Sequence, residues 1–150
     1  MTRQEKALKY FNDGFHCSQA VFAAFADLCG IGEEQALRIG ACFGSGMRKG
    51  EVCGACSGAL MVLGSLYGQY DLADACSRQT ANEVNDRMVS GFEEACGSYV
   101  CKEILGYDIS TPEGKKCARE KNLFRERCPQ LVANAVAVLE EIIRERKQDE

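Results

Sequence analysis

The sequence predicts an all-α protein, a single-domain helical bundle of about six to seven helices. Apolar residues recur at spacings of three and four along most of the chain, as they do on one face of a helix. No run of alternating apolar and polar residues reaches strand length with turn signals at both ends. A length of 150 residues with 46% apolar content suits one core, and no linker or repeat divides residues 1–150.

The first half of the chain contains four expected helices, at residues 2–12, 17–30, 33–43 and 53–67. Thr2 and Glu5 have the spacing of a capping box, which marks the first start. Glycines at positions 14 and 30 end the first two helices. The fourth helix is nearly all apolar, which predicts a central, buried position.

The second half contains three more expected helices and one shorter segment. A long helix runs over residues 72–96, with a bend expected near 90–91, and the shorter segment covers 99–105. Two further helices begin at Pro112, behind the N-cap Thr111, and at Pro129. The last helix carries an apolar stripe, which closes the bundle or forms a homodimer.

Charge and segment patterns narrow the function classes. The net charge is −4, so no general attraction to nucleic acid or to anionic membranes is expected. The start lacks a signal-peptide pattern and no apolar run approaches the roughly 20 residues of a membrane span, so we expect a cytoplasmic protein. In a reducing cytosol, many cysteines indicate metal ligands or redox thiols before structural disulfides.

Ten cysteines are spread over all the expected elements, at positions 17, 29, 42, 53, 56, 76, 96, 101, 117 and 128. Only Cys53 and Cys56 have Cys-x-x-Cys spacing, so neither a zinc finger nor a ferredoxin run is present. A four-cysteine site must therefore be assembled in three dimensions, with one ligand from each helix. The competing interpretation for any one position is a buried free cysteine that acts as a small apolar residue.

The position of each cysteine relative to the expected helix ends indicates which ones are better candidates for chemistry. Cys17, Cys53 and Cys128 lie at expected helix N-termini, where free amides and the helix dipole stabilise a thiolate. Cys29 lies at an expected C-terminus, and Cys76 lies on an apolar row that predicts core packing. The three are therefore better candidates for chemistry than cysteines in the middle of helices.

Glycines and the single histidine surround these candidates. The loop 44–50 carries three glycines and two cations, and it favours a tight helix connection over an anion site. Gly54, Gly58 and Gly64 lower helix propensity, so we expect close contact with a neighbouring helix or a cofactor. His16, beside Cys17, is either a base for that thiol or a polar residue at a turn.

Four sequence segments resemble one known family: residues 15–21, the loop 44–50, residues 51–64, and residues 97–106 followed by Cys117. The combination resembles the C_GCAxxG_C_C family of bacterial and archaeal proteins, which are regarded as redox-active. The resemblance implies that the four defining cysteines correspond to Cys17, Cys53, Cys101 and Cys117. A similar domain occurs in split-Soret cytochromes c, which implies an iron–sulfur centre.

Three hypotheses follow from the sequence. The first is an iron–sulfur cluster for electron transfer, bound by Cys17, Cys53, Cys101 and Cys117, with an unidentified redox partner protein. The second is a thiol–disulfide oxidoreductase that uses Cys53 as nucleophile and Cys56 as resolving thiol, with no cofactor. The third is a zinc-stabilised interaction module, since zinc accepts the same ligands.

Overall fold

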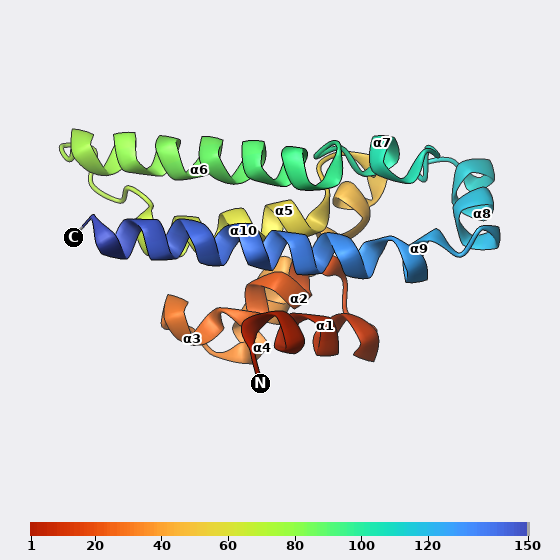
Figure 1. Ribbon diagram of the computed structural model, residues 1–150, viewed down its shortest axis with the longest axis horizontal. Coiled ribbons are helices and arrows are strands. Elements are labelled where there is room, and N and C mark those ends of the chain that lie inside the picture. The colour runs from red at the N-terminus through yellow and green to blue at the C-terminus, as the bar shows by residue number, and fades with distance from the viewer. Residues whose placement is uncertain (150) are drawn as a thin grey trace.

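The computed structural model describes residues 1–149 and confirms the all-α prediction (Figure 1). The elements are α1 (Arg3–Asp13), α2 (Cys17–Ala24), α3 (Ala26–Cys29), α4 (Glu33–Gly40), the π-helical turn η1 (Gly46–Gly50), α5 (Gly54–Tyr67), α6 (Ala75–Cys96), α7 (Cys101–Leu105), α8 (Pro112–Glu120), α9 (Leu123–Glu126) and α10 (Cys128–Gln148). Within residues 1–149 there is no β-strand, and one isolated antiparallel bridge joins Val52 to Val100.

The expected number of six to seven helices is wrong, because the described chain has ten α-helices. The predicted helix 17–30 is split at Phe25, whose φ of −114° and ψ of 9° leave the helical region. The short α7 and α9 supply the other two additions, and α9 begins after Asn122 at a φ of 59°. Local backbone breaks of this kind do not change the spacing of apolar residues, so that spacing cannot predict them.

Most predicted helix ends are found where the capping residues place them. The amide of Glu5 donates to Thr2 Oγ1 at 3.1 Å, and the amide of Gly114 donates to Thr111 Oγ1 at 3.0 Å. The long helix begins later than expected, because Asp74 accepts a hydrogen bond from the amide of Ser77 at 3.0 Å and caps it there. The bend expected near residues 90–91 is absent from α6.

The central helix is α5, as its apolar sequence predicts. It packs against α2, α6 and α10, with Val62 and Leu63 fully buried. The antiparallel α6 and α10 cover one side, and α1 to α4 form the other side (Figure 1). Core residues such as Met88, Phe92 and Leu139 complete this main cluster.

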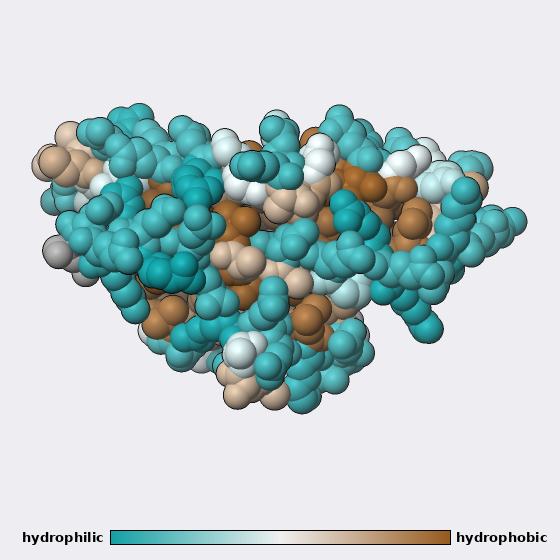
Figure 2. Space-filling model, viewed as in Figure 1, coloured by the Kyte–Doolittle hydropathy of each residue, from teal (hydrophilic) through white to brown (hydrophobic). Residues whose placement is uncertain are grey.

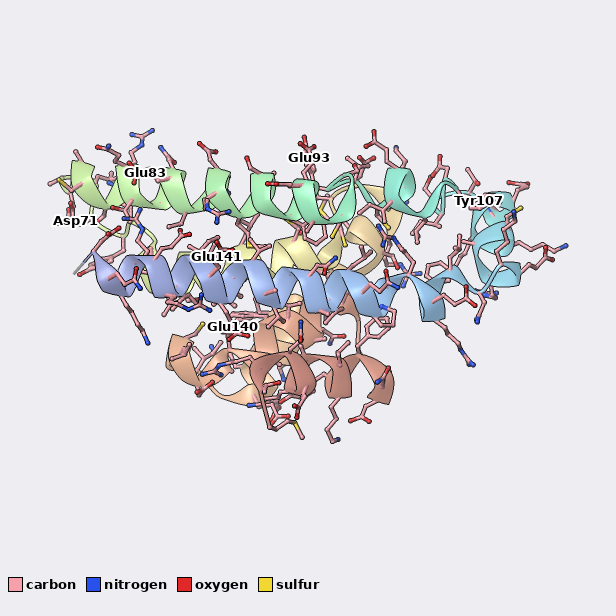
Figure 3. The ribbon with its side chains drawn as sticks, viewed as in Figure 1. Asp71, Glu83, Glu93, Tyr107, Glu140 and Glu141 are labelled. Carbon is pink, nitrogen blue, oxygen red and sulfur yellow. The ribbon has the colours of Figure 1, made fainter. Side chains whose placement is uncertain are left out.

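Ion pairs join the outer faces of α6 and α10. Arg87 pairs with Glu141 at 3.2 Å, and Arg146 pairs with Glu83 at 2.9 Å; Figure 3 shows the two glutamates on opposite helices. Most of the visible surface is hydrophilic, with smaller hydrophobic areas in the recesses between helices (Figure 2). The apolar stripe of α10 faces α1, α5 and α6 and so closes the bundle within one chain.

Candidate functional site

Four cysteines come together from four separate helices. Cys17 is the first residue of α2, Cys101 is the first of α7 and Cys128 is the first of α10, while Cys53 is the N-cap of α5. Cys17 and Cys53 accept hydrogen bonds from backbone amides at these helix starts, where negative charge is stabilised. We call Cys17, Cys53, Cys101 and Cys128 the thiol cluster.

The thiol cluster borders one cavity of about 300 Å³. The other walls are mostly apolar, with the aromatic rings of Phe11, Phe15 and Phe124 among them. This volume is at the lower end of the range for ligand and cofactor sites. The cavity therefore combines a low-polarity enclosure with four sulfur atoms, which are soft ligands and redox-active groups.

The isolated bridge sets the relation between two of these cysteines. The amide of Cys53 donates to the carbonyl of Tyr99 at 2.8 Å, and the amide of Cys101 donates to the carbonyl of Glu51 at 2.6 Å. Segments about 48 residues apart in the sequence are thereby fixed side by side at the starts of α5 and α7. Neither the apolar period nor the cysteine spacing predicts this pairing.

Cys17 occupies a backbone pocket made by three amides. The N–H groups of Ser18, Ser45 and Ala55 donate to its sulfur. Gly54 makes room for it, because a Cβ at that position would lie 2.5 Å from Cys17 Sγ and 2.9 Å from the carbonyl oxygen of Phe43. The sequence prediction of close contact is therefore confirmed at Gly54.

The other two helix glycines differ from each other. A Cβ at Gly58 would lie 2.6 Å from the carbonyl oxygen of Ser18, so this glycine lets α5 and α2 approach closely. Gly64 has open space around it, and the expected contact there is wrong. Of these three glycines, the two that allow a close approach to α5 thus lie toward the end that carries the thiols.

Cys17 and Cys53 share a hydrogen bond that separates their acidities. The Cys53 thiol donates to the Cys17 sulfur, and this bond, together with the three amides, lowers the pKa of Cys17 to about 7 despite its burial. Donation to that thiolate, together with burial, raises the pKa of Cys53 well above its ordinary value. At pH 7 Cys17 is therefore divided about equally between thiol and thiolate, while Cys53 keeps its proton.

The other two members of the thiol cluster are held protonated. Burial, with a smaller contribution from the charge of Cys17, raises the pKa of Cys101 to about 12. Burial and the charges of Cys17 and Cys101 raise the pKa of Cys128 to about 12, although Arg127 acts in the opposite direction. Cys17 is thus the one member of the thiol cluster that ionises near neutral pH, and the other three face the cavity as thiols.

The structure brings together three of the four predicted ligand residues. Cys17, Cys53 and Cys101 line the cavity, whereas Cys117 lies partly exposed on α8 and does not line it. Cys128 takes the fourth position on the cavity wall. Its placement directly before Pro129, at a helix start, was the sequence signal that marked it, as it marked Cys17 and Cys53.

The Cys53 and Cys56 side chains lie in different environments. Cys56 is fully buried in the core, where burial first and Cys96 second raise its pKa to about 12. Cys53 is only 3% exposed and has a strongly raised pKa, so it is not the exposed, acidic nucleophile that the sequence hypothesis requires. The thiol that contacts Cys53 is Cys17.

Cys76 and His16 also have defined places. Cys76 is exposed, so the expectation that it fills the core is wrong; α6 begins only at Ala75, and its first turn extends beyond the core. His16 is the N-cap of α2 and lines the cavity beside Cys17. A Cβ at Gly44 would lie 2.4 Å from His16 Cγ, so this glycine accommodates the imidazole.

Two kinds of feature are absent from residues 1–149. Across this part of the chain, no group of three or more His, Cys, Asp or Glu side chains has an arrangement that could hold a metal ion. No helix there is both long enough and apolar enough to cross a bilayer.

Comparison with known proteins gives one match. The model of a family described as "Putative redox-active protein (C_GCAxxG_C_C)" matches residues 15–142, a region that contains every residue of the thiol cluster. No curated protein and no solved structure matches the chain.

Proposed function

Because the chain belongs to the C_GCAxxG_C_C family, we propose that its redox activity resides in the thiol cluster and that these thiols bind an iron–sulfur cluster for electron transfer. One observation carries the proposal: four cysteines from four helix N-termini border a single apolar cavity. The proposed ligand set differs from the sequence-based set in one residue, with Cys128 in place of Cys117.

The donor set suits such a cluster. Four cysteine thiolates are the usual ligands of iron–sulfur clusters, and hydrogen bonds to sulfur, burial and net charge set the reduction potential. The amides of Ser18, Ser45 and Ala55 already donate to one of the four sulfurs. Helix N-termini stabilise the negative charge that thiolates and sulfides bring into the cavity.

The spacing of the thiols favours a cluster over a single ion. The four sulfurs border a cavity and do not converge on one point, whereas a zinc ion needs all its ligands within about 2.3 Å of one centre. An iron–sulfur cluster places several irons and sulfides between its ligands and supplies reversible electron transfer when bound. The chain's own contribution is to exclude water with Phe11, Phe15 and Phe124 and to hold charge with its amides.

The test is metal and acid-labile sulfide content, with a visible spectrum, on full-length protein purified without oxygen. We expect iron and sulfide in stoichiometric amounts. Replacing each member of the thiol cluster by serine in turn should remove most of the iron. Cys117→Ser is the matched control for Cys128→Ser, and we expect it to keep full iron content.

Other outcomes separate the alternatives. Full iron retention in all four cluster variants would contradict the proposal, and loss of iron in Cys117→Ser with retention in Cys128→Ser would restore the sequence-based ligand set. Zinc as the only metal would favour the structural module. The cytoplasmic location, the partner protein and the homodimer stay predictions from the sequence.

A second candidate function is thiol–disulfide exchange at Cys17 and Cys53, supported by the hydrogen bond between them. In this reaction the Cys17 thiolate attacks a substrate disulfide and releases one substrate thiolate. The Cys53 sulfur, after losing its proton, then attacks Cys17 Sγ and displaces the second substrate thiolate. The protein thereby gains a disulfide as the substrate is reduced. Iron-free protein that forms a Cys17–Cys53 disulfide with oxidised glutathione, detected by peptide mass spectrometry, would favour this function.

A further inference from the structure

A second, smaller pocket adjoins the thiol cavity. Its volume is about 100 Å³, and His16, Ser45 and Phe124 line both spaces. Its remaining walls are Arg48 from η1, Lys115 from α8 and Ile109 from the connection between α7 and α8. A ligand in this pocket is therefore separated from the thiols only by shared wall residues.

Apart from the Cys17 thiolate, the charged side chains that line these two spaces are all cations. Arg48 and Lys115 line the small pocket and Arg125 lines the cavity, and no carboxylate among residues 1–149 lines either space. These three cations form no ion pair within the described chain. The whole protein has a net charge of −4, so this concentration of positive charge runs against its composition.

A nearby carboxylate does not neutralise the pocket. Glu51 lies beside the loop 44–50, since a Cβ added at Gly46 would be 2.4 Å from the Glu51 backbone nitrogen. The Glu51 carboxylate pairs with the Lys102 ammonium at 3.4 Å. That carboxylate is thus already engaged by a cation outside the pocket. Arg48 and Lys115 remain available to an external anion.

The backbone that presents Arg48 is strained. Ser45, Gly46, Met47 and Arg48 have consecutive positive φ values of 55°, 59°, 58° and 63°, a left-handed turn that costs L-residues roughly 1–2 kcal/mol each. Such strain persists where the surrounding structure enforces it, and it concentrates at functional sites. The same turn donates the Ser45 amide to Cys17 and places Arg48 in the adjoining pocket.

We infer that this pocket binds a small anion, a phosphate or a carboxylate group, next to the cavity that holds Cys17. Arg48 and Lys115 hold the anion, and the Phe124 ring forms the wall shared with the cavity. An anionic small molecule is favoured over an acidic protein because the pocket is small and concave and adjoins a second cavity. The inference concerns binding alone, so it goes beyond the proposed redox function and does not depend on it.

The first test is calorimetric titration of full-length protein, as purified, with inorganic phosphate at constant ionic strength. We expect saturable binding of one phosphate per chain, weakened at least tenfold in Lys115→Gln and in Arg48→Asn. Asparagine tolerates the left-handed conformation, so the second variant removes the charge and preserves the turn. Lys116→Gln is the matched control on α8, because Lys116 does not line the pocket, and we expect less than a twofold change.

The second test compares two alkylating reagents on reduced, chelator-treated full-length protein, resolved by peptide mass spectrometry. Anionic iodoacetate should modify Cys17 faster relative to neutral iodoacetamide than it modifies exposed Cys42 or Cys76. Phosphate and Lys115→Gln should both remove that preference. Neither result requires iron, so failure of this inference and failure of the cluster proposal can be told apart.

Three outcomes would overturn the inference. They are absence of saturable phosphate binding, equal weakening in the Lys116→Gln control, and binding of an acidic peptide through Arg48 and Lys115 without any phosphate binding. The last would identify the region as a docking surface for an acidic protein.

Discussion

Two parts of α5, one helical turn apart, use the same residue type in opposite ways. Cys53 is the N-cap, beside the cavity, and it shares a hydrogen bond with Cys17. Cys56 lies in the core between α5 and α6, where it is fully buried and next to Cys96. The sequence joins the two cysteines as one Cys-x-x-Cys pair, whereas the fold assigns them to different environments.

This difference indicates what suits a cysteine to the proposed redox chemistry. Its position at a helix start and on the cavity wall matters more than Cys-x-x-Cys spacing. All four members of the thiol cluster lie at a helix start on the cavity wall, and at Cys17 and Cys53 backbone amides there bond to sulfur. The backbone amides that follow Cys56 already donate to carbonyls within α5, so they are not available to its sulfur. If this comparison is right, changes at the N-terminal end of α5 should alter the site, and changes further along should alter only stability.

The largest expected effect comes from Gly54→Ala. The added methyl would lie 2.5 Å from Cys17 Sγ and 2.9 Å from a backbone oxygen, so the thiol must leave its amide pocket. We expect a loss of roughly 1–3 kcal/mol in the free energy of unfolding, as is typical of overpacking. We also expect loss of most bound iron. Urea unfolding and iron analysis on the same preparation measure both.

Gly64→Ala is the matched control for Gly54→Ala. It lies on the same helix with open space around it, so alanine should raise stability by up to about 1 kcal/mol through helix propensity alone. Iron content should stay unchanged. Equal damage from both substitutions would mean that α5 responds as one unit, and it would contradict the comparison.

The next effect is on the acidity of Cys17. Cys53→Ala removes the hydrogen bond that contributes most to the lowered pKa of Cys17, so that pKa should rise from about 7 toward its ordinary value. In iron-free protein at pH 7, alkylation of Cys17 by iodoacetamide should slow roughly tenfold, because less thiolate is present. The rate is followed against pH with peptide mass spectrometry.

Cys56→Ala is the control for this measurement, and we expect it to leave the Cys17 profile where it is. A Cys17 profile that moves equally in both variants would show that the pKa depends on the packing of α5 in general and not on the Cys53 thiol.

Much of the fold follows from the sequence. The apolar period identifies every long helix, and capping residues such as Thr2 and Thr111 fix their starts. The split at Phe25 and the start at Asp74 are missed, because both depend on local backbone geometry that leaves the apolar pattern unchanged. The exposure of Cys76 is missed for the same reason, since apolar spacing gives the face of a helix but not how far the core extends along it.

The site is predicted less completely. Helix-start signals place Cys17, Cys53 and Cys128 correctly at helix starts, and backbone amides donate to the sulfurs of the first two. The presence of Cys101 beside them depends on the Val52–Val100 bridge, a tertiary contact that no local pattern encodes. The left-handed turn at residues 45–48 is equally hidden, because three of its four residues are not glycine.

A smaller effect is expected in the core part of α5. Cys56→Ala removes one fully buried sulfur, and we expect a loss of about 1 kcal/mol, comparable to removal of one buried methylene. Iron content should be unchanged, because Cys56 does not line the cavity. Thermal or urea unfolding combined with iron analysis tests this. Iron loss from Cys56→Ala would contradict this expectation and show that both cysteines of the Cys-x-x-Cys pair are needed for iron binding.

The smallest expected effect concerns a shifted pKa far from the thiols. The Arg3 guanidinium donates two hydrogen bonds to Asp27, one of them at 2.9 Å, and this pairing lowers the pKa of Asp27 to about 2. Because the folded pKa lies below the unfolded value of about 3.9, the pair stabilises the fold above pH 4, and the contribution is lost as pH falls from about 4 to 2. Asp27 is 61% exposed, so solvent screening keeps the contribution below about 1 kcal/mol.

Asp27→Asn should therefore lower stability slightly at pH 7 and flatten its decline between pH 4 and pH 2, as measured by urea unfolding across that range. Arg3→Met should produce the same flattening, since either change removes the pairing. Neither variant should change iron content or the alkylation of Cys17, because Asp27 lies in α3, which follows the end of α2 opposite Cys17. The lowered pKa of Asp27 is thus expected to affect stability and not the thiol cluster. A change in the iron content of Asp27→Asn would contradict this expectation.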